Sequence, residues 1–346
     1  MKANDINQIL QQIRLQPNQS SKTLYKSLAI EISYATFKRR IKTLLDKKLI
    51  VTTGQGRATT YKISPAYALF LPINIDIYFD QEIDERQVKE SFDFELISNV
   101  LANVSLFNND ELRYLDGLQK QFQENIDGLS QNEYHKEMER LAIDLSWKSS
   151  QIEGNTYSLL ETERLLKEKQ TAEGKSKDDA IMLLNHKQAL DFIINDPNYI
   201  TPLSIARIED IHSILIKELG VQKNIRKRRV GISGTNYRPI DNEFQIRESL
   251  QQMCRLVNNK ENIFEKALLL LLLISYIQAF NDGNKRTARI ISNAVLISHN
   301  YCPISFRTVN SIDYKKAMLL FYEQNNLTAF KDIFIQQFEF AVNTYF

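Results

Sequence analysis

The sequence predicts a mainly α-helical protein with a small α+β domain at its N-terminus. Ten glycines and seven prolines in 346 residues are few, which favours long helices over a sheet-rich fold. The longest apolar run, "ALLLLLLISYI" at 267–277, is too short to cross a bilayer and indicates a buried core helix. A chain of this length has room for two or three domains.

Basic residues are concentrated at the N-terminus. Residues 1–66 contain twelve Lys or Arg and three Asp or Glu, a net charge of +9, whereas the remainder carries 32 basic and 39 acidic side chains, a net charge of −7. This split suggests two domains with different partners. Only Cys254 and Cys302 are present and the N-terminus lacks a signal-peptide pattern, so a reducing cytoplasm is the expected compartment.

The first 66 residues show the order of elements of a winged helix-turn-helix domain. Residues 4–15 carry apolar side chains at helical spacing, and two more helices are expected between Pro17 and residue 48. Two β-prone runs then flank Gly54 and Gly56, which indicates a hairpin.

The helix expected at residues 36–47 leaves Lys38, Arg39 and Lys42 facing outward, and Arg57 lies on the expected wing. In a DNA complex this helix would enter the major groove, with Arg57 near phosphate. The alternative is a module that only mediates contacts within the protein or between subunits, its basic side chains being solvated. The net charge of +9 favours nucleic acid, because phosphate neutralisation supplies most non-specific affinity.

Residues 67–90 are expected to be a connector without helical periodicity, followed by a helical domain at 91–346. Loops in that domain are expected near residues 127–131, 171–177, 196–202 and 222–245.

The stretch "QAFNDGNKRTAR", residues 278–289, places cations where a helix begins. The first N–H groups of a helix have no intrahelical partner and the helix dipole is positive there, so Lys285 and Arg286 break a local rule. A bound anion removes the conflict, because those N–H groups, Gly283 and the cations together form a phosphate cradle. Asp282 alone would repel phosphate, but it can share Mg²⁺ with it. The alternative is a surface turn whose charges face water.

The same stretch resembles the signature of the Fic family, His-x-Phe-x-Asp/Glu-Gly-Asn-x-Arg-x-x-Arg, at every specified position except the first. "SSQIEGN", residues 149–155, resembles the family's inhibitory motif, with Ser149, Glu153 and Gly154 in the specified places. Residues 226–240 resemble the flap, a β-hairpin that lays target backbone beside the site. The resemblance implies an all-α Fic core with a small β-hairpin flap and an inhibitory helix at about 140–155.

The resemblance also implies a role for each matching residue. Asp282 would bind Mg²⁺, and Arg289 would meet the γ-phosphate of ATP. The implied reaction transfers AMP to a Ser, Thr or Tyr hydroxyl of a target protein, with pyrophosphate leaving. The residues expected to contact the nucleotide are Gly234, Thr235, Gly283, Asn284, Lys285, Arg286 and Arg289.

Gln278 stands where the family has the histidine that takes the proton from the attacking hydroxyl. An amide cannot accept that proton near neutral pH, and a positioned general base is worth roughly 10²- to 10⁴-fold in rate. AMP transfer is therefore expected to be slow or undetectable, whereas nucleotide binding is expected to persist. The four histidines are expected to be surface or packing residues: His135, His186, His212 and His299.

Glu153 is expected at an exposed helix end, because Gly154 is a good helix-stopping residue. The resemblance implies that its carboxylate pairs with Arg289, takes the place of the γ-phosphate and holds ATP in an unreactive pose. The alternative is an ordinary solvated glutamate.

Two functions remain open at this point. The first is a self-inhibited Fic-type adenylyltransferase, weakened by Gln278, that uses ATP and Mg²⁺ on a protein hydroxyl. The second is a non-catalytic regulator that binds nucleotide in the cradle and DNA through the winged helix. A homodimer is left open, and no membrane association is expected.

Overall fold

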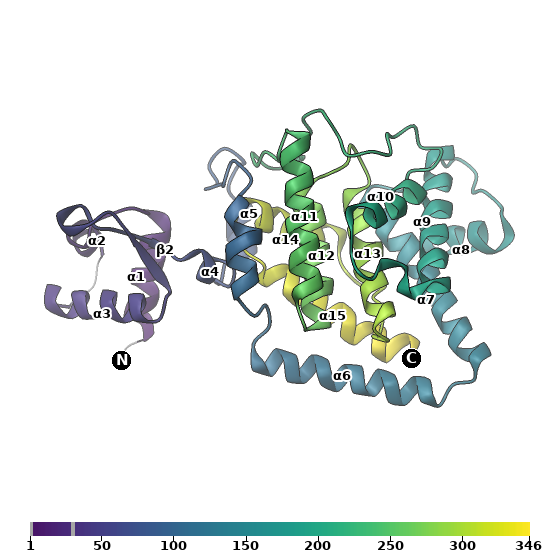
Figure 1. The fold of residues 1–346 in the computed structure, drawn as a ribbon, viewed down its shortest axis with the longest axis horizontal. Helices are drawn as coiled ribbons and strands as arrows, with labels where there is room; N and C mark the ends of the chain where they lie inside the picture. The colour runs from purple at the N-terminus through teal and green to yellow at the C-terminus, as the bar shows by residue number, and fades with distance from the viewer. Residues whose placement is uncertain (1–2, 29–31) are drawn as a thin grey trace. The chain divides into compact units, whose positions relative to one another are not determined.

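A computed structural model describes residues 3–28 and 32–346, which divide after Pro72 into two compact units (Figure 1). Each unit has its own elements and its own buried residues. Among the described helices, none combines the length and the apolar content needed to span a bilayer.

The N-terminal unit contains three helices followed by an antiparallel hairpin. The helices are α1 (Ala3–Leu15), α2 (Ser21–Ser27) and α3 (Tyr34–Asp46), and the strands are β1 (Ile50–Thr53) and β2 (Thr60–Ile63). Ser20 and Ser33 cap α2 and α3, each accepting a hydrogen bond from a backbone N–H of the first turn. The elements lie where the sequence places them, although the turn between α2 and α3 falls partly outside the described residues.

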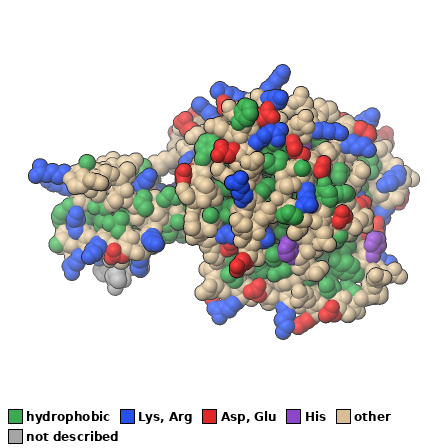
Figure 2. Space-filling view, viewed as in Figure 1, with side chains coloured by type: hydrophobic (Ala, Val, Ile, Leu, Met, Phe, Trp, Pro, Cys, Tyr) green, Lys and Arg blue, Asp and Glu red, His purple; other side chains and the backbone are tan. Residues whose placement is uncertain are grey.

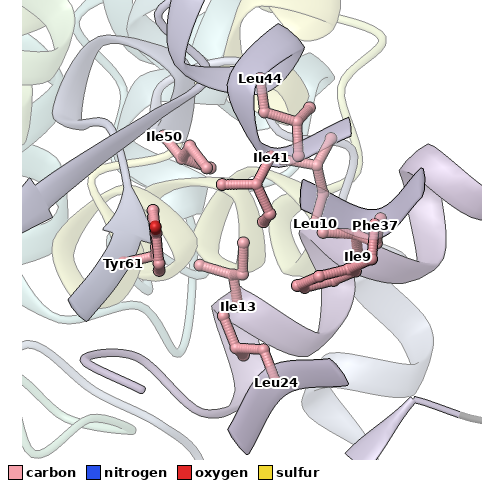
Figure 3. Packing of buried hydrophobic residues seen from close by; sticks show 9 residues of the cluster. All are labelled: Ile9, Leu10, Ile13, Leu24, Phe37, Ile41, Leu44, Ile50 and Tyr61. Carbon is pink, nitrogen blue, oxygen red and sulfur yellow. The ribbon is translucent and has the colours of Figure 1, made fainter. Parts of the chain in front are cut away.

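Apolar side chains from every one of these elements meet in one core (Figure 3). The apolar face predicted for residues 4–15 supplies three of its members, and the face predicted for α3 supplies three more. The buried set is Ile9, Leu10, Ile13, Leu24, Phe37, Ile41, Leu44, Ile50 and Tyr61.

The second unit is helical, as expected. Its long helices are α6 (Asn109–Asp127), α7 (Gln131–Ile152), α8 (Leu159–Glu168), α9 (Lys177–Asn195), α10 (Ile205–Leu215), α11 (Glu243–Asn259), α12 (Ile263–Ile277), α13 (Asn284–Ser298), α14 (Ser311–Gln324) and α15 (Thr328–Tyr345). Shorter turns are a π turn at Leu96–Val100 and 3₁₀ turns at Leu101–Asn103 and Pro197–Ile200.

Helix α12 is the centre of this unit (Figure 1). Every residue from Ala267 to Ile277 is buried, as expected for a helix that is apolar all round. Helix α13 packs along α12 and also contacts α9 and α10. The turn between α12 and α13 is thereby held on a fully packed base.

Two expectations about irregular segments need correction. Residues 226–240 were expected to form a β-hairpin, but β1 and β2 are the only strands in the part of the chain that the structure describes. This segment is instead an extended loop bonded to other elements, and its one bridge pairs Arg238 with Ser91. The connector also has helical turns, α4 (Pro65–Ala68) and α5 (Ile75–Phe79), which the capping residues Ser64 and Asn74 begin.

Phe37→Ala tests whether the N-terminal unit has an independent core. Phe37 is fully buried, so truncation should cost about 3–5 kcal/mol and selectively lower the unfolding temperature of this unit. Differential scanning calorimetry of the full chain would measure it, with Lys38→Ala, the exposed neighbour, as control. If the unfolding temperature of the second unit fell by the same amount, the two units would not have separate cores.

Candidate nucleotide site

The turn after α12 depends on two residues in the left-handed backbone region. Gln278 ends α12 with φ 52°, and Gly283 begins α13 with φ 82°. A Cβ on Gly283 would lie 3.2 Å from Ile216 Cγ2 and 3.4 Å from the His212 ring. Glycine is therefore favoured here both by its backbone conformation and by close packing.

Asn284 stabilises the turn through hydrogen bonds within it. Its Oδ1 accepts a hydrogen bond from the Phe280 N–H (2.9 Å), and its Nδ2 donates to the Phe280 carbonyl (2.8 Å) and to Gln278 Oε1 (3.1 Å). No side chain caps the N-terminus of α13 among the described residues. The first N–H groups of α13 consequently face a site without a protein acceptor at the cap.

The cations of the turn are paired with carboxylates rather than solvated. Arg289 is fully buried, and its Nη2 donates to Glu153 Oε1 at 2.8 Å. Lys285 Nζ lies 3.7 Å from Glu153 Oε2, and Arg286 Nη2 donates to Asp282 Oδ2 at 2.7 Å. The structure thus excludes a surface turn whose charges all face water.

Ser149 completes the contact between α7 and Arg289. The Arg289 Nε donates to Ser149 Oγ at 2.8 Å, and Nη2 donates to the Ser149 carbonyl at 3.0 Å. Both residues are fully buried. Two residues 140 positions apart are thereby bound in a fixed geometry.

Glu153 lies at the end of α7, where Gly154 with φ 103° lets the chain leave the helix. Its side chain is only 21% exposed, so the expectation of an exposed helix end was wrong. Ion pairs with Lys285 and Arg289 of α13 leave Glu153 half-buried. Burial alone raises the pKa of Glu153, but the charges of Arg289 and Lys285 outweigh burial and hold that pKa below its ordinary value.

An open pocket of about 380 Å³ lies beside this turn. Of the residues that the sequence singled out, Glu153, Gln278, Asp282, Gly283, Asn284 and Lys285 line it. Arg286 and Arg289 are buried and do not line it, while Gly234 and Thr235 follow the lining residues 230–233 in the chain. Sequence reasoning missed the lining residues of α14, which no motif marks: Lys315, Met318, Leu319 and Tyr322.

The Gln278 side chain is held at both ends of its amide. Its Nε2 donates to the Ser275 carbonyl at 2.7 Å and lies 3.5 Å from the Tyr322 hydroxyl, while Oε1 accepts from Asn284. None of the four histidines lines the pocket. The residues present therefore offer no histidine to replace the one that the Fic signature has at this position.

His212 was not assigned a place from the sequence, and the structure puts it against the turn. Its ring stacks on Phe280 with centroids 3.6 Å apart, and Nε2 lies 2.9 Å from the Asp282 carbonyl. Burial lowers the pKa of His212 although hydrogen bonds to backbone carbonyls oppose this effect. Both ring nitrogens face backbone carbonyls, so His212 supports the turn rather than facing the pocket.

Asp282 is the one carboxylate of the turn that reaches outward, with its side chain 61% exposed. No group of three or more His, Cys, Asp or Glu side chains suited to a metal occurs within the described ranges. A single carboxylate suits Mg²⁺ when substrate phosphates supply the other ligands, so the residues present fit Mg²⁺ bound together with phosphate and not by protein alone.

In the N-terminal unit, Lys38, Arg39, Lys42 and Arg57 are exposed. Figure 2 shows basic side chains spread over the visible face of this unit, with few acidic ones. A shallow hollow between α3 and β2 is lined by three of the basic residues and three apolar ones: Lys38, Arg39, Lys42, Ile41, Leu45 and Tyr61. The four cations predicted to meet DNA are thus accessible.

The second unit thus combines a buried apolar helix, a glycine turn and a carboxylate from a separate helix. Residues 202–296 match the model of the Fic/DOC family. The matched range contains the loop, α12, the turn and most of α13, whereas α7 with Ser149 and Glu153 lies outside it.

Curated relatives are similar over part of the chain. It is 28% identical over 176 residues to the protein adenylyltransferase Fic of Nematostella vectensis, covering 49% of this chain and 40% of that protein. It is 28% identical over 166 residues to the protein of the same name from Aedes aegypti, covering 44% and 32%. The matches span less than half the length of these relatives.

Solved structures share the fold. Fic-1 of C. elegans aligns with a TM-score of 0.60 at 20% identity, covering 68% of this chain and 72% of that one. A Fic domain containing signaling protein from Bacteroides thetaiotaomicron aligns with a TM-score of 0.57 at 17% identity, covering 67% and 95%.

Glu153→Gln tests the buried ion pair. At pH 7 the variant should be about 1–3 kcal/mol less stable to unfolding. The reason is that Arg289 would donate to a neutral amide oxygen and no longer to an ionised carboxylate. The folded-state pKa of Glu153 is below its ordinary value of 4.5, so this stability is present above pH 4.5 and is lost as pH falls through the folded pKa. The difference in the free energy of unfolding between variant and wild type should therefore decrease below pH 4.5.

Urea denaturation across pH 3–7 would measure this gap. Glu163→Gln is the control, because Glu163 forms an exposed ion pair with Lys167 and its loss should change stability little. A Glu153 effect no larger than that of Glu163, or a gap independent of pH, would contradict the charge assignment.

Proposed function

We propose that the second unit binds ATP with Mg²⁺ and is a Fic-type adenylyltransferase held inactive by Glu153 and slowed by Gln278. The observation that carries this proposal is the Glu153 carboxylate, seated on Arg289 and Lys285 beside the uncapped N-terminus of α13. The names of the curated relatives support the adenylyl-transfer class.

The nucleotide would bind through its phosphates. The first residues of α13, whose N-terminus no side chain caps, line the pocket and would offer their backbone N–H groups to phosphate. Lys285 lines the pocket, and Asp282 is exposed there to hold Mg²⁺. Bound Mg²⁺ would neutralise phosphate charge, which otherwise opposes binding beside a carboxylate.

Glu153 would compete with the terminal phosphate. Its carboxylate supplies the negative charge that buried Arg289 requires, and an unpaired buried guanidinium is costly. A γ-phosphate could satisfy the same guanidinium only if Glu153 withdrew. With Glu153 in place, the triphosphate would have to bind in another pose, and the resting protein is therefore inhibited.

In the transfer step, a protein hydroxyl oxygen would bond to the α-phosphorus as the bond to the pyrophosphate oxygen breaks. The hydroxyl proton must leave, and the family's histidine is absent. The Gln278 amide cannot take the proton, and its two ends are already bonded to Ser275 and Asn284. The rate should therefore be lower by roughly 10²- to 10⁴-fold than with a positioned base.

Glu153→Gly should tighten binding of Mg²⁺-ATP by about 5- to 150-fold, the usual range for release of a competing interaction. Isothermal titration calorimetry would measure it. Glu168→Gly is a matched control, because Glu168 ends α8 in an exposed position and lies outside the pocket. Equal affinities for ATP in wild type and Glu153→Gly would contradict the inhibitory role.

Glu153→Gly combined with Gln278→His should incorporate AMP from α-labelled ATP into itself or an added protein. Histidine tolerates the left-handed backbone at this position better than most residues, so the fold should be retained. Glu153→Gly with Gln278 unchanged is the control and should label far more slowly. A folded, ATP-binding double variant without incorporation would contradict adenylyl transfer.

A second candidate function is favoured by the N-terminal unit. We propose that Lys38, Arg39, Lys42 and Arg57 contact the phosphates of duplex DNA. All four are exposed, and residues 1–66 carry a net charge of +9. In that case nucleotide bound in the second unit would regulate DNA binding, and AMP transfer would be a secondary activity.

Lys38→Ala, Arg39→Ala and Lys42→Ala together should weaken binding to a labelled duplex and flatten its dependence on salt by about three ion equivalents. Fluorescence anisotropy between 50 and 200 mM salt would measure both. Lys22→Ala, Lys47→Ala and Lys62→Ala form a control of equal charge change at other exposed or half-exposed sites. An equal loss in both triple variants would contradict a defined surface on α3.

A further inference from the structure

Arg86 is a buried cation outside the Fic signature, and it joins two separate elements of the second unit. Its side chain is 3% exposed. Its Nη1 lies 3.4 Å from Glu323 Oε1 on α14, and its Nη2 donates to the Gly234 carbonyl at 2.7 Å. The guanidinium also lies 5.0 Å from the centroid of the Phe79 ring.

One end of this connection is the loop that borders the pocket. Residues 230–233 line the pocket, and Gly234 follows them directly. Because this loop forms no strand pair of its own, its position depends on bonds to other segments. Three hydrogen bonds to residues 84–90 hold it. Arg86 donates one to the Gly234 carbonyl, and Asp84 accepts one from Asn236 Nδ2 at 2.9 Å. The Glu90 carbonyl accepts the third from the Arg238 N–H at 2.8 Å.

The other end is helix α14, which also lines the pocket. Glu323 is fully buried and directly follows Tyr322, a lining residue. Its second carboxylate oxygen accepts a hydrogen bond from the Tyr78 hydroxyl at 2.6 Å. The backbone N–H of Lys89 also donates to the Glu323 carbonyl at 2.8 Å.

These contacts make Arg86 the bridge between loop 230–237 and helix α14. A guanidinium suits this position because its planar fork can donate to a carbonyl and meet a carboxylate at once, whereas a lysine ammonium is a point charge. Within the described ranges, no hydrogen bond or ion pair joins Arg86 to the turn at 282–289. The bridge therefore acts on two elements that line the pocket, and not on the turn itself.

We propose that Arg86 is a positioning residue that fixes loop 230–237 against α14 and so sets the place of the acceptor hydroxyl. The role in transfer rests on the adenylyltransferase function proposed above, but the effect on the loop does not. Loss of the bridge should loosen the loop, reduce transfer and leave the affinity for triphosphate unchanged.

The first test is independent of function and uses hydrogen exchange of the full chain. Arg86→Met with Glu323→Gln removes both charges, so that no lone buried carboxylate destabilises the fold. The amides of Tyr237 and Arg238 donate to Thr235 Oγ1 and to the Glu90 carbonyl. They should exchange about 10- to 100-fold faster, the effect of losing a charged hydrogen bond, and Arg86→Lys should be intermediate. Asp76→Asn, on the same segment but at an exposed pair with Lys316, should match wild type.

Unchanged exchange at Tyr237 and Arg238 would overturn the proposal. Exchange that rises by the same factor in α12 and α13 would overturn it too, because Arg86 would then be a general stabiliser. These outcomes do not depend on whether the protein binds nucleotide or transfers AMP.

The second test separates positioning from binding. In the Glu153→Gly, Gln278→His background, the Arg86→Met, Glu323→Gln change should lower the rate of AMP transfer at least about tenfold. The Kd for Mg²⁺-ATP should change by less than about twofold, because the phosphate contacts are untouched. Equal losses in the rate of AMP transfer and in the affinity for Mg²⁺-ATP would contradict a positioning role. If the Glu153→Gly, Gln278→His variant itself transfers no AMP, the adenylyltransferase function is contradicted. The role of Arg86 in holding the loop is then decided by hydrogen exchange alone.

Discussion

The second unit depends on compensating positive charge where α13 begins. Arg289 is fully buried, and neither Arg286 nor Lys285 is free in solvent, so each needs a negative partner. Glu153 and Asp282 supply the carboxylates from opposite directions, one from α7 and one from the turn itself. A site that must carry negative charge in its resting state is also one that a polyphosphate can enter by exchange with a carboxylate.

The side chain of Gln278 and the groups suited to phosphate are physically separable. Gln278 is bonded to the helix behind it and to Asn284, so it has become part of the structure of the turn. The groups suited to phosphate are the helix terminus, Gly283 and Lys285, and none of them requires a histidine at position 278. Binding and turnover can therefore differ widely in this chain, which keeps a regulatory use of nucleotide compatible with the same pocket.

The loop bordering the pocket shows how a local pattern can mislead. Its residues resemble a hairpin, yet no strand pair forms across it. Gly234, Asn236 and Arg238 form hydrogen bonds with residues 84–90 instead. Because those partners lie about 150 positions earlier in the chain, periodicity within the loop could not reveal them. The same holds for Tyr322 and Lys315, which reach the pocket only because α14 packs beside the turn.

The sequence alone determined the helical second unit, the helix–helix–helix–hairpin order of the first, and the turn at 278–289, because local periodicity, capping residues and glycine act over short distances. It also indicated the pair of Glu153 with Arg289, but only through resemblance to a family. Tertiary structure decided that Glu153 is half-buried, that His212 supports the turn and that Arg86 joins loop to helix. Burial and pairing between distant segments depend on how helices pack, and no short stretch of sequence contains that information.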